Sequence, residues 1–314
     1  MTTDASIRIG LNLPTWPRQD RTYAAWPEIR ALARDAEALG VDTLWAPDHL
    51  QRSLPGEPLI GFWEAWTIIT AVAEATSRVE IGPFVACTGF RNPALLAKMA
   101  ATLDEVSGGR LVLGLGSGVP DRDDSWRAFG YSGERHVTRY AESVEITSRL
   151  LRERAVTVSG EVLHTDGAEI VPRGPRPDGL PVWVAALGER TARVAARWAD
   201  AINVNRPLGS LTDVEAVRRV AAEACEAEGR DPVTLAVTGW ARLSLDARGV
   251  AVPHAGCLDG TPAEIGDQVR AFHAAGLAHI TFYVGADGDP SRLPALTAET
   301  LARFAPALAA IRGA

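Results

Sequence analysis

The sequence has few cysteines and no long apolar segment. Its three cysteines, Cys87, Cys225 and Cys257, lie far apart, and none belongs to a C-x-x-C pair, which argues against a disulfide framework and a structural zinc site. No apolar run approaches the roughly 20 residues that cross a bilayer. The first residues lack the basic segment and apolar core of a signal peptide. We therefore expect a soluble, cytoplasmic protein with no membrane partner.

The sequence also lacks an excess of basic residues. It has 32 Lys and Arg against 39 Asp and Glu, a net charge of -7, which argues against nucleic acid or an anionic membrane as its main partner. Apolar residues make up 46% and charged residues 23% of the 314 residues, so a sizeable core can form. We expect a small molecule as the main partner.

Two kinds of catalytic motif are missing as well. No H-x-H or H-E-x-x-H spacing occurs, so the sequence does not support a metal site. Ser117 lies between Gly116 and Gly118 rather than in a G-x-S-x-G motif, which disfavours a serine hydrolase.

The chain does contain a regular alternation of apolar strand-like segments with amphipathic helical ones. The predicted strands cover residues 7–13, 41–46, 78–86, 110–115, 182–186, 201–204, 233–241 and 278–284. The predicted helices cover residues 27–40, 61–76, 92–106, 134–153, 189–199, 213–228, a segment opened by a Thr261/Glu264 capping box, and 293–311.

Strand-then-helix alternation predicts a parallel sheet, and eight such units in this length favour an α/β fold of the (β/α)8 TIM-barrel type, with residues 1–314 as one domain. An open doubly wound sheet is the alternative. Residues 155–171 alternate and contain two turns, which predicts a small antiparallel excursion. Residues 242–260 read as a loop, one of several insertions expected on the catalytic face.

In a parallel barrel, function is expected where the strands end. Three clusters fall at such ends: Asp48-His49, then Gly116-Ser117-Gly118, then the segment 185–191. The SGGR turn at 107–110 enters a strand at the opposite end, so we expect it to be structural.

The glycine cluster at 114–118 has four readings. It can be a dinucleotide-binding loop, although Val119-Pro120-Asp121 cannot open the helix which that motif requires. It also resembles the first motif of a nucleoside methyltransferase, but three strand-helix units precede it. The remaining readings are a barrel loop beside a cofactor and a closely packed turn.

The segment 185–191 leads directly into a predicted helix. Free N–H groups at the helix N-terminus, the Thr191 hydroxyl and the Arg190 guanidinium would form an anion site. The alternative is an ordinary turn with Glu189 and Arg190 in solvent.

His49 follows a carboxylate at a strand end, where an imidazole can give or take a proton near neutral pH. A histidine bound to a neighbouring carbonyl is the structural alternative. Tryptophans lining a cleft would suit a flat cofactor or apolar substrate, although packing explains most of the nine. The candidates for the substrate pocket are Trp16, Trp45, Trp126 and Trp240, with pocket walls expected around Trp16 and residues 242–258.

Five stretches together are similar to one known family. They are VDTLWAPDHL, RVEIGPFVACTGFRNPALLAKMAATLDEVSGGRLVLGLGSG, WRAFG, LPVWVAALGERTARVAARWADAINV and GTPAEIGDQVRAFHAAGLAHITFY. The chain resembles the bacterial luciferase-like superfamily of flavin- and coenzyme F420-dependent (β/α)8 oxidoreductases, over nearly its whole length.

The resemblance implies roles for several residues. Asp48 and His49 would lie beside the cofactor ring, with His49 facing the reactive ring atom and moving a proton. A bulge with a non-prolyl cis peptide would support the ring near Phe84-Val85-Ala86. Gly116, Ser117 and Gly118 would lie along the cofactor, whose tail phosphate would bind the segment that contains Ala185, Ala186, Gly188, Glu189, Arg190 and Thr191.

The sequence departs from the family pattern after the glycine cluster. Relatives often have a glutamate or asparagine there, whereas this chain has Val119-Pro120-Asp121-Arg122-Asp123-Asp124. Which of Asp121, Asp123 and Asp124 takes a functional role is left open at this point. Phe84 is also bulky where relatives usually have small residues.

The resemblance favours coenzyme F420 over FMN, because compact single-barrel members resemble the F420 branch. The main alternative is an FMN-dependent monooxygenase that uses reduced flavin and O2. A non-catalytic flavin-binding relative and a methyltransferase remain further alternatives. The resemblance also implies a homodimer through the second and third helices, with Ala94, Leu95, Ala97, Met99 and Ala100 on the apolar face.

Overall fold

Nine parallel strand segments form a barrel in the computed structural model, which describes residues 6–53, 56, 58–252, 257–286 and 295–313. The barrel segments are β1 (Arg8–Asn12), β2 (Thr43–Ala46), β5 (Glu80–Pro83), β6 (Ala86–Cys87), β7 (Leu113–Gly116), β10 (Val182–Ala186), β11 (Ala201–Pro207), β12 (Ala236–Leu245) and β13 (His279–Ala286).

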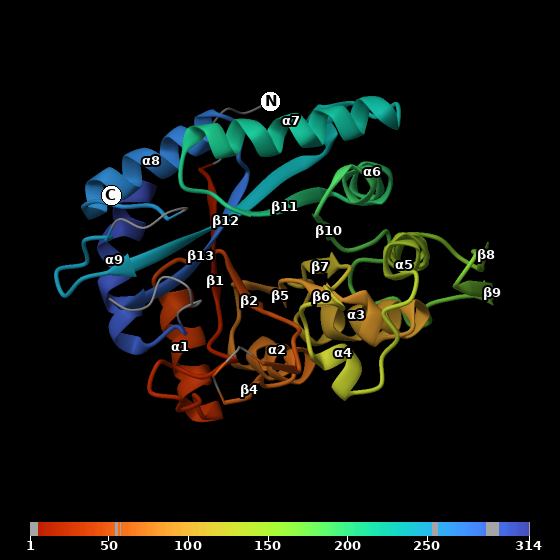
Figure 1. Ribbon diagram of the computed structural model, residues 1–314, viewed down its shortest axis with the longest axis horizontal. Coiled ribbons are helices and arrows are strands. Elements are labelled where there is room, and N and C mark those ends of the chain that lie inside the picture. The colour runs from red at the N-terminus through yellow and green to blue at the C-terminus, as the bar shows by residue number, and fades with distance from the viewer. Residues whose placement is uncertain (1–5, 54–55, 57, 253–256, 287–294, 314) are drawn as a thin grey trace.

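Helices surround the strands, as Figure 1 shows. They are α1 (Trp26–Ala38), α2 (Ala65–Ala75), α3 (Pro93–Val106), α4 (Ser125–Ala128), α5 (His136–Arg152), α6 (Glu189–Trp198), α7 (Leu211–Ala227), α8 (Pro262–Ala274) and α9 (Ala298–Arg312), with short 3-10 turns at Thr88–Phe90 and Pro232–Thr234.

The strand order is β5-β2-β1-β13-β12-β11-β10-β7-β6, with every neighbouring pair parallel. The two ends of this order meet, because Ile81 of β5 forms a parallel bridge with Leu111, just before β7. β5 and β6 are therefore two halves of one barrel strand, interrupted at Phe84 and Val85. The predicted (β/α)8 barrel is confirmed.

Two small antiparallel sheets lie outside the barrel. The pair β8 (Val156–Ser159) and β9 (His164–Ala168) is the predicted excursion. The pair β3 (Gln51–Arg52) and β4 (Ile60–Gly61) was not predicted from the sequence. Each of the latter strands has only two residues, too few to show a periodic pattern.

The predicted loop over residues 242–260 was wrong for its first four residues, because residues 242–245 belong to β12. β12 continues to Leu245 because β13 pairs with it in register as far as Ala286, beyond the point where β13 pairs with β1. Residues 253–256 of the expected pocket wall lie outside the described residues.

Local sequence explains where several elements begin and end. Thr261 and Glu264 form the predicted capping box of α8, with Thr261 N–H donating to Glu264 at 2.7 Å. Gly108 and Gly109 end α3 with φ values of 65° and 85°, where a side chain would be strained. Arg110 donates to carbonyls of Ala73 and Val79, so the SGGR turn is structural, as predicted.

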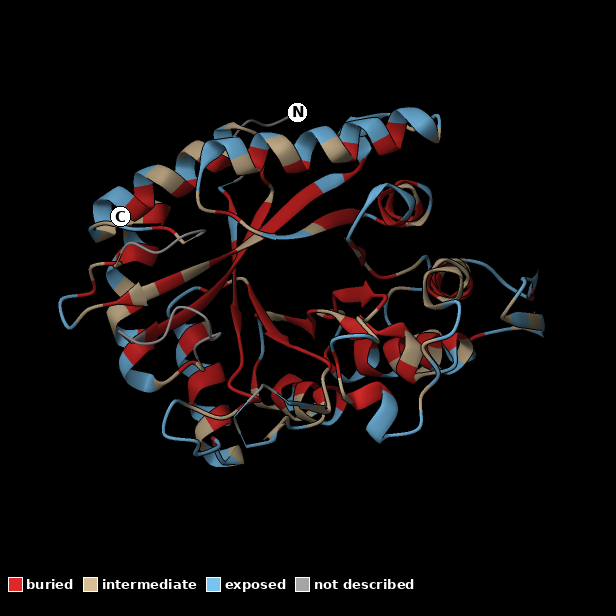
Figure 2. Ribbon diagram, viewed as in Figure 1, coloured by how far each residue is buried: buried red, intermediate tan, exposed pale blue. Residues whose placement is uncertain are grey.

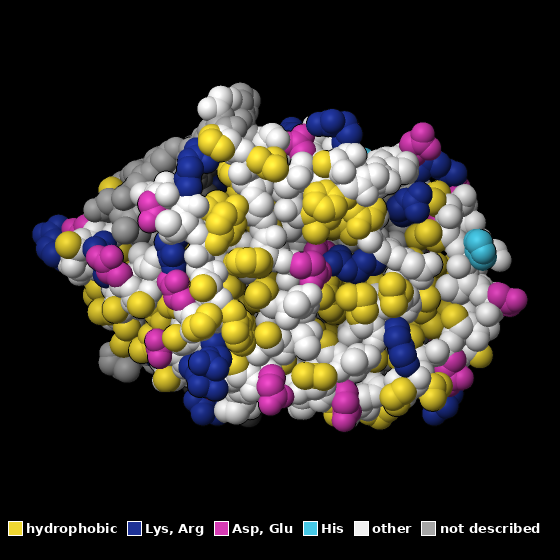
Figure 3. Space-filling model, turned by 90° about the horizontal axis from the view of Figure 1, so that it is seen from below, with side chains coloured by type: hydrophobic (Ala, Val, Ile, Leu, Met, Phe, Trp, Pro, Cys, Tyr) yellow, Lys and Arg dark blue, Asp and Glu magenta, His cyan; other side chains and the backbone are white. Residues whose placement is uncertain are grey.

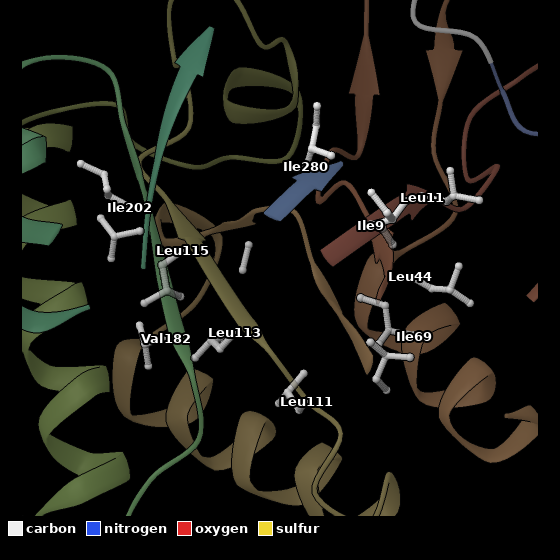
Figure 4. Close-up of a cluster of buried hydrophobic side chains, with 14 of the residues drawn as sticks. Ile9, Leu11, Leu44, Ile69, Leu111, Leu113, Leu115, Val182, Ile202 and Ile280 are labelled. Atoms are coloured by element: carbon white, nitrogen blue, oxygen red, sulfur yellow. The ribbon is translucent and has the colours of Figure 1, made fainter. Parts of the chain in front are cut away.

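Alternating strand residues divide between two cores. Those facing the helices are aliphatic, and Figure 4 labels several of them together with Ile69 of α2: Ile9, Leu11, Leu44, Leu111, Leu113, Leu115, Val182, Ile202 and Ile280. The barrel strands are buried along most of their length (Figure 2). The barrel interior instead holds large rings, with Trp45 against Phe84, Trp183 and His279 at centroid distances of 5.2, 5.0 and 5.9 Å.

The buried histidine in this interior gives the fold a pH-dependent stability. Burial, helped by the charges of Arg8 and Arg312, lowers the pKa of His279 to about 3. Below about pH 6.5 His279 is protonated in the unfolded chain but stays neutral in the folded chain. The free energy of unfolding therefore falls as pH decreases from about 6.5 towards 3. We expect His279→Gln to remove up to about 1.4 kcal/mol per pH unit from this slope. Urea unfolding between pH 7 and pH 5 measures it; an unchanged slope would contradict the assignment, and His164→Gln, on the exposed excursion, is the control.

The face covered by α2 and α3 bears on the predicted homodimer. Hydrophobic side chains gather on the face viewed from below in Figure 3, on the side where Figure 1 places α2 and α4. Of the expected contact residues, Leu95 is 54% exposed, but Ala97 and Ala100 are completely buried within the protein. The homodimer stays a prediction. Among the described residues, no helix is both long and apolar enough to span a bilayer.

Candidate functional site

The three predicted clusters lie at the same end of the barrel, because all barrel strands run parallel. β2 ends immediately before Pro47-Asp48-His49, β7 ends at Gly116, and β10 ends at Ala186. The loops that follow these strands therefore share the carboxyl rim.

Asp48 is almost completely buried beneath this rim and holds other groups in place. Its Oδ2 accepts from Arg91 Nη1 at 2.5 Å and from the Cys87 amide at 2.9 Å, while its Oδ1 accepts from Arg91 Nη2 at 3.1 Å. Burial raises the pKa of the Asp48 carboxyl, against the opposite effect of Arg91 and the Cys87 amide. Both oxygens of Asp48 thus accept hydrogen bonds from within the protein. The contact of Asp48 with a cofactor ring stays a prediction.

Arg91 was missed by the sequence analysis, although it is the partner that makes a buried Asp48 tolerable. It also donates to Glu64 at 2.8 Å and lies over the Trp66 ring at 5.8 Å. Burial lowers the pKa of Arg91, but Asp48 and Glu64 raise it more, so the guanidinium keeps its charge. An arginine just after a short 3-10 turn carries no sequence signal for such a role.

His49 has one ring nitrogen occupied and the other open. Its Nδ1 lies 2.7 Å from Oδ2 of Asp123, and its ring contacts Phe62 at a centroid distance of 5.2 Å. The His49 side chain is 42% exposed, whereas the Asp123 side chain is 5% exposed. No hydrogen bond reaches Nε2 from the described residues.

Asp123 is the aspartate that the structure brings to His49 among the three the sequence left open. Burial opposes its ionisation, but hydrogen bonds from His49 and Ser125 outweigh burial and lower the pKa of Asp123. Asp124 instead accepts from the Ser53 amide at 2.8 Å.

The interrupted third strand packs on the glycine cluster. A non-prolyl cis peptide joins Phe84 to Val85, as the resemblance implied, and Ala86 follows in β6. A Cβ at Gly116 would overlap Val85, and one at Gly114 would overlap the Pro83 carbonyl. Close packing therefore explains why Gly114 and Gly116 have no side chain.

The rest of that cluster is also packed. A Cβ at Gly118, whose φ is 68°, would lie 2.7 Å from Trp126 and 2.8 Å from Cys87 Sγ. Ser117 is buried, and its hydroxyl donates to the Gly118 carbonyl at 2.9 Å. That Gly116, Ser117 and Gly118 lie along a cofactor stays a prediction.

The expected anion site at the start of α6 has fewer free donors than the sequence implied. Thr191 Oγ1 accepts from the Leu187 and Gly188 amides at 2.9 and 3.1 Å and donates to the Gly188 carbonyl at 2.9 Å. The Thr191 hydroxyl and two amides are thus used within the turn. A Cβ at Gly188 would meet nothing within 4 Å, so the backbone there is open to approach.

A cavity of about 480 Å³ adjoins this turn, between α5 and α6. Its lining includes Glu189, Arg190, Arg193 and Arg197. Arg190 donates to Thr138 at 3.1 Å, and Arg193 pairs with Glu228 at 2.6 Å. The cavity wall is basic next to the predicted tail site. Ala185 and Ala186 form the end of β10 behind it, where Tyr140 Oη lies 2.8 Å from the Ala185 carbonyl.

The four predicted pocket tryptophans fall in three places. Trp16 and Trp240 meet at Tyr283, with ring centroids 6.0 and 5.5 Å from it. Trp45 is completely buried inside the barrel, and Trp126 packs on Phe90 under the rim loops. Of the four tryptophans, only Trp16 and Trp240 belong to one aromatic cluster at the strand ends. The sequence analysis did not predict that Tyr283 belongs to this cluster.

Asn12 is a further residue that the sequence analysis missed. It ends β1 at the same height as Tyr283, since Leu11 pairs with Phe282. Asn12 is 3% exposed, and its amide interacts with the Tyr283 hydroxyl, which favours the ionised phenol although burial raises the pKa of Tyr283 overall. A polar residue at the end of the first predicted strand was the available signal.

The described residues contain no group of three or more His, Cys, Asp or Glu side chains that could hold a metal ion. The three cysteines are free. Burial, followed by the nearby Asp48 charge, raises the pKa of the Cys87 thiol to about 12, so it is unreactive near neutral pH.

A model of the luciferase-like monooxygenase family matches residues 7–248. The chain belongs to this family.

Among luciferase-like relatives, a 5,10-methylenetetrahydromethanopterin reductase of Methanolobus tindarius is 29% identical over 219 residues, which are 70% of this chain and 62% of the relative. A phthiodiolone/phenolphthiodiolone dimycocerosates ketoreductase of Mycobacterium tuberculosis is 32% identical over 224 residues, 64% of this chain and 56% of the relative. The matched part thus spans less than two thirds of each relative's length.

Solved structures share the luciferase-like fold over nearly the whole chain. An F420-dependent secondary alcohol dehydrogenase superposes with a TM-score of 0.74 at 18% identity, covering 96% of this chain and 99% of the other. EDTA monooxygenase from Chelativorans sp. BNC1 superposes with a TM-score of 0.77 at 14% identity, covering 98% and 94%. At these identities the likeness concerns the fold alone.

Proposed function

We propose that this luciferase-like oxidoreductase uses coenzyme F420 and that His49 moves a proton to or from a small organic substrate. The observation that carries the proposal is the setting of His49 after β2, with Nδ1 bound to Asp123, no hydrogen bond to Nε2 from the described residues, and the side chain 42% exposed. An imidazole held this way can act as a general acid or base.

The residues at the strand ends fit a flat polar cofactor with an anionic tail. The amide of buried Asn12, beside Tyr283, carries both donor and acceptor groups that could meet polar ring substituents. The open backbone at Gly188 and the Arg190 guanidinium provide room and positive charge for a tail phosphate. When bound, coenzyme F420 would exchange a hydride at C5 of its ring.

The names of the relatives support a reductase rather than an oxygenase. Both matched relatives are reductases, one of them a ketoreductase, and one superposing structure is an F420-dependent secondary alcohol dehydrogenase. A ketone and secondary-alcohol couple is therefore the substrate class we propose. An FMN-dependent monooxygenase is the second candidate, because EDTA monooxygenase shares the fold.

Paired equilibrium titrations of the purified protein test the cofactor. Coenzyme F420 and FMN are titrated separately while tryptophan fluorescence is followed, and bound F420 is then offered secondary alcohols and ketones. We expect F420 to bind at least tenfold more tightly than FMN and to change redox state with some members of the panel. Tighter FMN binding would favour the monooxygenase, and binding of neither by a folded sample would overturn both.

A further inference from the structure

His49 and Asp123 are joined across two loops that lie 74 residues apart in the chain. Asp123 contributes both oxygens, since Oδ2 contacts His49 Nδ1 and Oδ1 accepts from the Ser125 amide at 2.9 Å. A buried carboxylate fixed at both oxygens has one orientation, and it imposes that orientation on the imidazole.

The next two residues hold the rest of the His49 loop by other contacts. Ser125 Oγ accepts from the amides of Leu50 and Gln51 at 3.2 and 3.0 Å and donates to the Gln51 carbonyl at 2.9 Å. Asp124 holds the Ser53 amide. Of these three neighbours, only Asp123 contacts the imidazole itself, so loop position and ring orientation are fixed by separate side chains.

We propose that Asp123 is a positioning residue that fixes the tautomer of His49, so that proton exchange takes place at Nε2. This proposal rests on the function proposed above. An ionised Asp123 can only accept a hydrogen bond, and it therefore keeps the proton of neutral His49 on Nδ1. The lone pair of neutral His49 is then on Nε2, which no hydrogen bond from the described residues occupies.

Oxidation of a secondary alcohol releases one hydride and one proton, and the proton leaves through His49. In alcohol oxidation the substrate C–H bond breaks, and the deazaflavin, when bound, would accept the hydride. The O–H bond breaks and its proton goes to Nε2, leaving a ketone and an imidazolium paired with Asp123. The partly exposed ring then releases the proton to water, and ketone reduction runs the same steps in reverse.

Three variants separate ring orientation from loop support. Asp123→Asn replaces an obligate acceptor with a group that can also donate to Nδ1, so the proton of neutral His49 moves partly to Nε2. Ser125→Ala removes loop contacts without touching His49. Asp124→Asn makes the same chemical change one residue away and serves as the matched control.

The first readout uses the cofactor-free protein. ¹⁵N histidine NMR should place the His49 proton on Nδ1 in the wild type, Ser125→Ala and Asp124→Asn proteins, with a substantial Nε2 fraction in Asp123→Asn. An Nε2-protonated wild type, or an unchanged tautomer in Asp123→Asn, would overturn the proposal whatever the cofactor is.

The second readout is turnover with F420 and a substrate from the panel. We expect Asp123→Asn to lower kcat at least tenfold and to shift the pH-rate profile, with F420 affinity changed less than threefold. An equal loss in Ser125→Ala would mean that Asp123 only supports the loop. Failure of every protein to bind F420 would refute the proposed function, while the tautomer result would still decide the role of Asp123 towards His49.

Discussion

Replacing His49 with asparagine is expected to lower kcat with coenzyme F420 by about 10²- to 10⁴-fold, the usual contribution of a positioned general acid or base. Asparagine can still donate a hydrogen bond to Asp123 from near the position of Nδ1, but it has no counterpart of Nε2. The substitution therefore removes the proton-exchanging atom and leaves the contact between the two loops. Steady-state kinetics with the best substrate of the panel measures the loss.

Binding of F420 should survive in His49→Asn, with a dissociation constant within about threefold of the wild type. His164→Asn is the matched control, because His164 lies exposed on β9 of the antiparallel excursion. Full turnover by His49→Asn would show that proton transfer takes place elsewhere. Loss of folding, detected by circular dichroism, would be assigned to the loop, and His49→Gln would then repeat the test.

Arg91→Met is expected to have the largest effect on stability. It leaves Asp48 buried with only the Cys87 amide as a partner, and breaking a buried ion pair typically costs about 3–5 kcal/mol. Without Arg91, burial raises the pKa of Asp48 with little opposition, so the folded protein binds a proton more readily than the unfolded chain. The deficit should therefore grow as pH rises and be smaller at pH 5 than at pH 8.

Urea unfolding of both proteins at pH 5 and pH 8 measures this deficit. The double variant Asp48→Asn/Arg91→Met should recover part of it, since a neutral buried pair removes the uncompensated charge. Arg154→Met is the exposed control, and its ion pair with Glu169 at 3.2 Å should contribute less than about 1 kcal/mol. A deficit in Arg91→Met no larger than this control would contradict the role assigned to the pair.

His49 and Asp48 are neighbours in the sequence but have different roles at the strand ends. His49 is partly exposed, while its sequence neighbour Asp48 is buried and holds the second half of the interrupted third strand through the Cys87 amide. From the sequence alone, Asp48 and His49 are only two adjacent polar residues at the end of one strand. Opposite directions of adjacent side chains give them different tasks.

The barrel could be predicted because its signal is repeated along the chain. Each strand-helix unit has its own apolar pattern and punctuation, such as the Thr261/Glu264 box before α8, so errors at single boundaries do not alter the count. The prediction failed where structure depends on a distant partner. The extra length of β12 exists because β13 continues beside it, and the two-residue strands β3 and β4 stabilise one another only as a pair.

The sequence by itself determined the class of fold, the end of the barrel where the candidate site residues gather, and His49 as the candidate for moving a proton. Each of these follows from local order: alternation, strand polarity, and a titratable side chain just after a strand. The tertiary structure decided which aspartate contacts His49, which arginine neutralises Asp48, and why Gly114 and Gly116 lack side chains. Those outcomes depend on segments brought together by barrel closure, and three nearby aspartates in one loop have the same local sequence signal until the fold buries one of them against the imidazole.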